Sequence, residues 1–259
     1  MKYAPHYLII GNGRVATHFS HYFSFLNIDF SSWHRRESEL KLNQKLSSAT
    51  HVLVLITDNA IESFVKTHRN KNNLMWVHFS GALVSDFVYG AHPLMTFNQE
   101  TYPKDTYAKI PFVIDQDAPA YETLLPGLPN PHCYLSKNKK AKYHALCVLS
   151  ANFSCLLWQK LFTDFQTEFD FPKEIAHPFL LQQTQNLLTD YRSALTGPLV
   201  RGDKETIEKN LSALTDDPFQ SVYKAFLDCY RECGITSTLS TSLNKERIDR
   251  NAHGARTRA

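Results

Sequence analysis

The 259-residue chain has few cysteines, and their arrangement marks neither a disulfide framework nor a metal centre. The five cysteines are an odd number, are scattered and include no Cys-x-x-Cys pair, which favours a reducing compartment. The N-terminus lacks the charged start, apolar core and small-residue cleavage site of a signal peptide. No continuous apolar run approaches the ~20 residues that span a bilayer. We therefore expect a cytoplasmic protein with no membrane partner.

The chain also lacks a strong charge of either sign. Its 28 Lys and Arg residues and 25 Asp and Glu residues give a formal net charge of +3, which gives no reason to expect nucleic-acid binding. Part of the basic excess lies in residues 244–259, which have almost no apolar side chains, and we expect this tail to be disordered. The twelve histidines show no metal-ligand spacing, so no metal is expected.

Short apolar runs dominate residues 6–135 and are separated by segments of helix length. This alternation predicts parallel βαβ units and a sheet covered on both faces. From Ser136 onward the strand signal disappears, and the chain is predicted to divide into domains at residues 1–135 and 136–243, followed by the tail. The expected strands contain the sequences HYLII, IDFSSW, HVLVLI, MWVHF, FVYGAH and IPFVID.

The second domain is predicted to be all-α. Residues 138–165 have a broad apolar helical face and no proline, which predicts one long buried helix. Further helices are expected at about 172–195, at about 203–214 with Asp203 as N-cap, and at about 217–233, ending at Gly234.

A glycine loop follows the first predicted strand and opens a helix. The form Gly11-x-Gly13-x-x-Ala16 allows a tight turn, close approach of a diphosphate to the backbone, and close packing of helix on strand. The amides at the start of the helix would then bind the phosphates. The alternative is a glycine turn in an unrelated α/β protein. The residues expected to bind a dinucleotide here are Gly11, Asn12, Gly13, Arg14, Val15 and Ala16.

The end of the second predicted strand indicates which dinucleotide binds. An NAD site places an acid there to bond the ribose diol, but this chain has the sequence SSWHRR. Arg35 and Arg36 are suited to a 2′-phosphate, with Ser32 or His34 as supporting donors. Surface arginines without a ligand are the alternative. The missing acid favours NADP.

Several motifs in order resemble one known family: IIGNGRVATHF, SWHRR, ITDNAI, VHFSGAL, AHPLMTF, KAKYHALCVLSAN and LTGPLVRGD. Together they resemble the Rossmann-like family with a C-terminal domain of unknown function, DUF2520. That family is similar to the 6-phosphogluconate dehydrogenase, pyrroline-5-carboxylate reductase and prephenate dehydrogenase group. The resemblance implies a Rossmann doubly wound parallel sheet that binds NADP and a 6-phosphogluconate dehydrogenase-like all-α domain that dimerises.

Polar residues at the ends of predicted strands are candidates for the site, because ligands of such sheets bind there. Thr57 and Asp58 are expected near the nicotinamide ribose, although Asp58 could instead cap a helix. Ser80 could bind a substrate carboxylate or carbonyl, or be a turn serine. His92 precedes a proline, as in the histidine-proline loop of prephenate dehydrogenases, and is a candidate proton donor, substrate contact or structural residue.

The long helix supplies a second set of candidates. Lys140, His144 and Asn152 lie at i, i+4 and i+12, on one broad side of a helix. Similar β-hydroxyacid dehydrogenases carry a catalytic lysine and an asparagine on this helix, but their spacing differs. His144 is therefore the preferred general acid or base, with Asn152 orienting the substrate. The alternatives are a buried structural histidine and, for Lys140, a solvated helix start.

The sequence thus predicts an NADP-dependent oxidoreductase acting on a small, anionic carbonyl or imine compound between two domains. One alternative is an enzyme of the prephenate dehydrogenase or pyrroline-5-carboxylate reductase type. A second is a non-catalytic NADP-binding sensor or regulator, which fold analogy does not exclude. A homodimer through the helical domain is expected.

Overall fold

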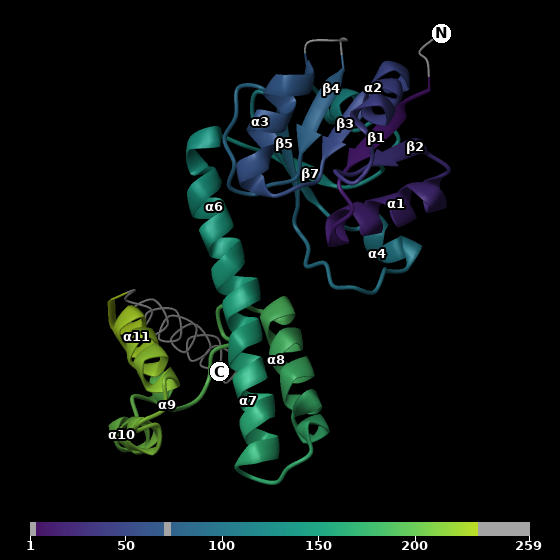
Figure 1. Ribbon diagram of the computed structural model, residues 1–259. Coiled ribbons are helices and arrows are strands. Elements are labelled where there is room, and N and C mark those ends of the chain that lie inside the picture. Colours follow the sequence, from purple (N-terminus) through teal and green to yellow (C-terminus); the bar gives the residue numbers. More distant parts are fainter. Residues whose placement is uncertain (1–3, 70–73, 233–259) are drawn as a thin grey trace, which may run out of the picture. The chain divides into compact units, whose positions relative to one another are not determined.

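Strands and helices alternate in the N-terminal half of the chain, as the apolar runs predict. The structure is a computed structural model, and it describes residues 4–69 and 74–232 (Figure 1). Its contacts divide the chain into two units, residues 1–161 and residues 162–259. The predicted domain boundary at residue 135 falls where the last strand ends, whereas the contact boundary lies within a later helix.

One seven-stranded sheet forms the centre of the first unit, in the order β2-β1-β3-β4-β5-β6-β7. The strands are β1 (His6–Ile10), β2 (Asp29–Trp33), β3 (His51–Val54), β4 (Met75–His78), β5 (Tyr89–Pro93), β6 (Phe112–Asp115) and β7 (His132–Leu135). The helices between them are α1 (Arg14–Leu26), α2 (Glu39–Ser48), α3 (Asp58–His68), α4 (Lys104–Ala108) and α5 (Tyr121–Leu124).

The doubly wound sheet is confirmed, with two differences from the prediction. Strands β1 to β5 are parallel, but β6 pairs antiparallel to β5, and β7 pairs parallel to β6. An apolar run carries no signal for strand direction, so the reversal at β6 could not be predicted. Strand β7 was not expected, because its sequence HCYL follows prolines at 126, 129 and 131, which favour a loop.

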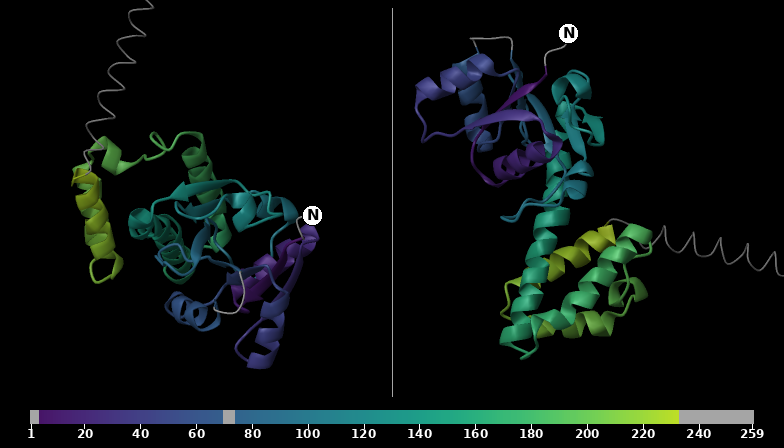
Figure 2. Two further views of the ribbon diagram at one scale, coloured as in Figure 1. Left: turned by 90° about the horizontal axis from the view of Figure 1, so that it is seen from above. Right: turned by 90° about the vertical axis from the view of Figure 1, so that its right-hand side faces the viewer.

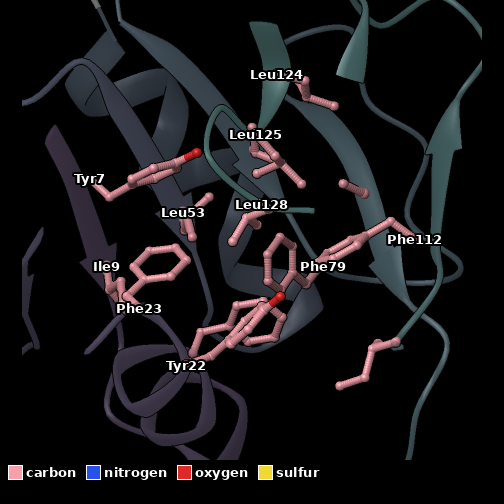
Figure 3. Packing of buried hydrophobic residues seen from close by; sticks show 14 of the residues in the cluster. Tyr7, Ile9, Tyr22, Phe23, Leu53, Phe79, Phe112, Leu124, Leu125 and Leu128 are labelled. Atoms are coloured by element: carbon pink, nitrogen blue, oxygen red, sulfur yellow. The ribbon is translucent and has the colours of Figure 1, made fainter. Parts of the chain in front are cut away.

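The sheet is buried on both faces because its central strands β1, β3 and β4 are apolar at all positions except one histidine in each. Tyr7 and Ile9 of β1 belong to one core cluster, and Leu8 and Ile10 belong to the other. The first cluster is completed by α1, α4 and α5, and the second by α2 and α3, which lie on the other side of the sheet (Figure 2). Figure 3 shows the first cluster, where Phe23 of α1 packs beside Tyr7. Because helices cover both faces of the sheet, a ligand can reach the strands only at their ends.

Helices follow the last strand, as predicted. After a 3₁₀ turn at Lys137–Lys139, the chain forms α6 (Lys140–Cys147), a π-helical segment (Val148–Phe153) and α7 (Ser154–Thr167). Asp203 caps its helix as expected, accepting a hydrogen bond from the amide of Thr206 at 3.1 Å. The predicted end at Gly234 and the tail lie outside the described residues. The remaining helices are α8 (His177–Thr189), α9 (Pro198–Arg201), α10 (Lys204–Ala213) and α11 (Phe219–Glu232).

The long helix is not buried in the single chain, and this part of the prediction is wrong. Leu146, Leu149 and Leu156 are 53%, 54% and 51% exposed. By length and composition alone, the helical stretch Lys137–Thr167 could cross a membrane, since an 18-residue window of it has a mean hydropathy of 1.3. One such helix is weak evidence for a membrane span, because a core helix of a soluble protein passes the same test.

Candidate functional site

A cavity of about 950 Å³ lies at the carboxyl ends of the first four strands. This is the edge at which open α/β sheets bind ligands. Its wall contains most of the residues that the sequence predicted for a dinucleotide: Gly11, Asn12, Gly13, Arg14, Val15, Arg35, Thr57 and Asp58. Ser80 lies in the same wall, after the end of β4.

The glycine loop has the geometry that its sequence predicts. Gly11 has a φ of +127°, and a Cβ atom there would collide with the carbonyl oxygen of Leu55. Gly13 is the N-cap of α1 and leaves open space, since a Cβ built on it meets no atom within 4 Å. No side chain caps this helix, so the amides of its first turn are available to a ligand. A bound anion would also be favoured by the helix dipole.

Three residues predicted for the dinucleotide do not line the cavity. Ala16 is buried in the core against the sheet. Ser32 uses its carbonyl oxygen to accept a hydrogen bond from Lys45. Arg36 is exposed outside the cavity wall, where its amide donates to His34 Nδ1 at 3.3 Å. Of the two neighbouring arginines, only Arg35 is therefore placed to meet a ligand in this cavity.

Helix α3 forms a wall of the cavity that the sequence reasoning missed. Its contributing side chains recur at i, i+3, i+4, i+7 and i+8, which is one face of a helix. His68 is held there between two oxygens, with Nδ1 2.7 Å from the Phe64 carbonyl and Nε2 3.0 Å from Glu39. The periodicity after Asp58 is a signal that could have identified this face. Its residues are Ala60, Ser63, Phe64, Thr67 and His68.

Asp58 and Ser80 are joined to each other. Thr57, not Asp58, occupies the cap position of α3. The Asp58 carboxylate lies in the first turn, where the helix dipole favours negative charge, and accepts a hydrogen bond from Ser80 Oγ at 2.5 Å. Ser80 Oγ also accepts hydrogen bonds from the amides of Ala82 and Leu83 at 3.3 and 3.0 Å. Ser80 therefore fixes the turn after β4, and its hydroxyl proton is already engaged.

Next to Ser80, two histidines and a tyrosine surround Gly81. The ring centroids of His92 and His144 are 6.0 Å apart, and the Tyr143 hydroxyl lies 2.7 Å from His92 Nδ1. A Cβ atom on Gly81 would lie 2.5 Å from a ring carbon of His144 and 3.2 Å from His92 Nε2. The missing side chain of Gly81 therefore lets both rings approach the backbone beside the cavity.

The histidines at the strand ends are held neutral by burial. Burial, with the charges of Lys140 and neighbouring groups, lowers the pKa of His78 to about 3. Burial, His144 and Lys140 lower the pKa of His92 to about 4, although Asp58 opposes this. His78 is fully buried, its Nδ1 accepts from the Ser80 amide at 3.1 Å, and its Nε2 has no hydrogen-bond partner among the described residues. At neutral pH these two rings act as uncharged donors and acceptors.

Lys140 is part of a buried ion pair. Its Nζ lies 2.6 Å from Asp115 Oδ1, and the two side chains are 5% and 2% exposed. The other oxygen of Asp115 accepts from the Gly90 amide at 2.7 Å, and a Cβ on Gly90 would collide with both charged groups. The alternative of a solvated helix start is therefore wrong for Lys140. The pair anchors the first turn of α6 to β5 and β6.

Asn152 is separated from this cluster. It is exposed and lies in the π-helical segment Val148–Phe153, which interrupts the regular spacing on which its predicted side of the helix depended. Within residues 4–69 and 74–232, it makes no hydrogen bond to the histidines. The same part of the chain contains no group of three or more His, Cys, Asp or Glu side chains placed to hold a metal ion.

Part of the site lies in a segment that matches a known family profile. Residues 110–228 match the family profile of DUF2520, a domain of unknown function. This segment supplies Asp115, Lys140, Tyr143 and His144, whereas the glycine loop and His92 precede it.

Solved structures share the fold of this chain. A Bacteroides fragilis protein proposed to be an NADP oxidoreductase is 20% identical, with a TM-score of 0.71 over 88% of this chain and 98% of its own. A Thermotoga maritima protein is 19% identical, with a TM-score of 0.63 over 90% and 99%. A reductive aminase from Aspergillus terreus, solved with NADPH and ethyl levulinate, is 14% identical, with a TM-score of 0.62 over 92% and 99%. No curated protein sequence matches the chain.

Proposed function

We propose that this protein is an NADP-dependent oxidoreductase that transfers hydride to or from a small, anionic carbonyl or imine compound. The observation that carries the proposal is the strand-end cavity, which has an uncapped glycine-loop helix in its wall and an arginine, rather than an acid, after β2. The fold is also that of a reductive aminase solved with NADPH. NADPH would supply the hydride.

The residues around Gly81 would act on the substrate. His144 is proposed as the general acid or base, with His92 beside it as a neutral group that contacts the substrate. Lys140 is held by Asp115 and would position α6 rather than transfer a proton. Asn152 stays a candidate for orienting the substrate. The convergence of polar rings next to the cavity favours an enzyme over a non-catalytic NADP-binding sensor.

The helical unit supports a homodimer. Among the described residues from 162 onward, the buried hydrophobic side chains are Ala176 and Leu227, while Leu181 and Leu188 are 69% and 78% exposed. So small a core does not balance the conformational entropy lost when these helices are ordered. A second copy would supply the missing apolar surface, whereas the tail of residues 244–259 is mostly polar. We also propose a cytoplasmic location. The buried ion pair of Lys140 with Asp115 ties the start of the apolar helix to the sheet, which favours a helix of a folded domain over a membrane span.

Cofactor choice is tested by titrating the protein with NADPH and NADH and following tryptophan fluorescence, since Trp33 lines the cavity. Arg35→Ala removes the arginine in the wall, and Arg36→Ala is the matched control outside it. Loss of a charge-assisted phosphate contact is expected to weaken NADPH binding by about tenfold to a hundredfold. NADH binding in Arg35→Ala and NADPH binding in Arg36→Ala should stay near the wild-type values.

Turnover is then measured as NADPH oxidation with a panel of small keto acids, aldehydes and cyclic imines. His144→Ala should bind NADPH normally and lose most of the activity. Equal binding of both nucleotides would overturn the assignment to NADP. Tight NADPH binding without turnover on any compound of the panel would favour the sensor.

A further inference from the structure

The hydrogen bond between His92 and Tyr143 joins residues 51 positions apart in the sequence, from β5 and from α6. Its oxygen-to-nitrogen distance is 2.7 Å, and the two rings meet edge to face at 5.6 Å. The sequence alone indicates no role for Tyr143. This partly buried bond decides which nitrogen of the His92 ring can donate to a ligand.

We propose that Tyr143 is a positioning residue that fixes the proton of His92 on Nε2, so that His92 binds a substrate oxygen or nitrogen as a neutral hydrogen-bond donor. The ligand class in this inference rests on the proposed function, whereas the tautomer of His92 does not depend on that function. The ligand class is a carbonyl, imine or carboxylate group, each of which presents an acceptor atom.

The Tyr143 hydroxyl donates the hydrogen bond, and His92 Nδ1 accepts it. Burial and the neighbouring Cys147 raise the pKa of Tyr143, so the hydroxyl keeps its proton at neutral pH. An imidazole nitrogen is a much stronger acceptor than a thiol sulfur, and the hydroxyl therefore donates to His92 Nδ1. In a neutral imidazole the remaining proton is then on Nε2. His78 follows the same pattern, because its Nδ1 accepts from the Ser80 amide.

The other ring nitrogen of His92, Nε2, has no hydrogen-bond partner in the described parts of the chain, and the residue is partly exposed. Nε2 faces Gly81, at 3.2 Å from the position of a Cβ atom that glycine lacks. Ser80, the preceding residue, lines the cavity. His92 and Gly81 do not themselves line the cavity, so a ligand would have to reach past Ser80 for its acceptor to satisfy this donor.

His92 and His144 have different roles. His92 stays neutral because most of it is shielded from solvent and it lies close to His144 and to the fixed charge of Lys140. A neutral donor binds and polarises an acceptor but gives up its proton poorly. His144, on the next position of the helix after Tyr143, is the ring that remains for proton transfer. The helix thus carries a positioning residue and a catalytic candidate side by side.

The tautomer is tested by long-range ¹H–¹⁵N correlation spectra of protein labelled with ¹⁵N-histidine, without cofactor or substrate. His92→Gln assigns the signals. The wild type should show a protonated Nε2 and an acceptor-type Nδ1 at pH 7. In Tyr143→Phe, which keeps the ring and removes only the hydroxyl, the Nδ1 shift should move and the tautomers should mix. Tyr134→Phe is the control, because the Tyr134 hydroxyl accepts from the Tyr121 amide and not from a histidine.

A proton on Nδ1 in the wild type, or unchanged His92 signals in Tyr143→Phe, would overturn the proposal. Both variants are first checked for folding by thermal denaturation. If the panel identifies a substrate, Tyr143→Phe should lower kcat/KM about tenfold, as expected for one lost hydrogen bond, with the Kd of NADPH unchanged. His92→Gln, which keeps a terminal N–H donor, should retain more activity than His92→Phe. If the protein binds no NADPH at all, the proposed function fails while the spectra still decide the tautomer.

Discussion

His78 and His92 show how a single side chain can link the site to the stability of the fold. Both rings have a folded-state pKa below the ordinary value of 6.5, at about 3 and about 4, because burial disfavours the charged form. The unfolded chain therefore binds protons more readily than the folded chain as the pH falls below 6.5. The stability that these residues contribute is complete above that value and is lost as the pH falls towards 4 and then 3.

The expected loss is about 2 kcal/mol of unfolding free energy for each histidine between pH 7 and pH 5. Urea denaturation at several pH values measures it. His78→Asn, whose side-chain oxygen can still accept from the Ser80 amide, should lose less stability over this interval than the wild type. The exposed His177 provides the control, as His177→Asn should leave the pH dependence unchanged. Equal slopes for wild type and His78→Asn would contradict the prediction.

Local residue patterns predicted the glycine loop and Arg35, but they did not predict the contact between Tyr143 and His92. The glycine loop could be identified because turn geometry and phosphate binding place requirements on adjacent residues. Arg35 could be identified because it follows a strand, but its separation from Arg36 depends on which side of the chain each arginine occupies. The contact of Tyr143 with His92 could not be predicted, since it depends on how α6 packs against a strand 51 residues earlier.

Among the elements, α6 is fixed by its first residue. Lys140 and Asp115 form a buried pair at 2.6 Å, and removal of one partner leaves an uncompensated charge in the core. Lys140→Met is expected to cost about 3–5 kcal/mol of unfolding free energy. The double variant Lys140→Met/Asp115→Asn should recover part of that loss, because asparagine can still accept from the Gly90 amide.

Urea denaturation of the two single variants and the double variant gives the coupling between these residues. Lys142→Met is a matched control on the same helix, where the side chain is exposed, and it should change stability by less than about 0.5 kcal/mol. Additive losses in the double variant would show that the pair does not act as a unit. The same measurement distinguishes anchoring from proton transfer, because anchoring changes stability in the absence of any substrate.

Periodicity predicted the type of most elements better than their surroundings. The apolar runs identified β1 to β6, whereas the spacing from Ala60 to His68, which marks the cavity-facing side of α3, is a signal that the sequence analysis did not use. The exposed surface of the long helix was not predicted, because an apolar face has the same sequence whether it is covered by its own chain or by another. The π-helical segment also has no sequence signal that we recognised, and it disrupts the side of the helix on which Asn152 was expected.

At the scale of the whole molecule, the missing core of the helical unit predicts self-association. Light scattering after gel filtration should give twice the chain mass of 29.7 kDa. Leu181 and Leu188 lie seven residues apart on α8, and both are largely exposed, so the double variant Leu181→Lys/Leu188→Lys should shift the mass towards one chain. Gln183→Lys adds a charge to the same helix and should leave the mass unchanged. A monomeric wild type would contradict the homodimer.

Gly90 has a consequence for how this sequence can diverge. A methyl group at this position would collide with Lys140 and Asp115, so alanine becomes acceptable only after the ion pair has been replaced by smaller or uncharged residues. The order of substitution is therefore constrained: the pair changes first and the glycine afterwards. Among homologues, those that keep both charges should keep the glycine, and side chains should appear at this position only where the charges have been lost.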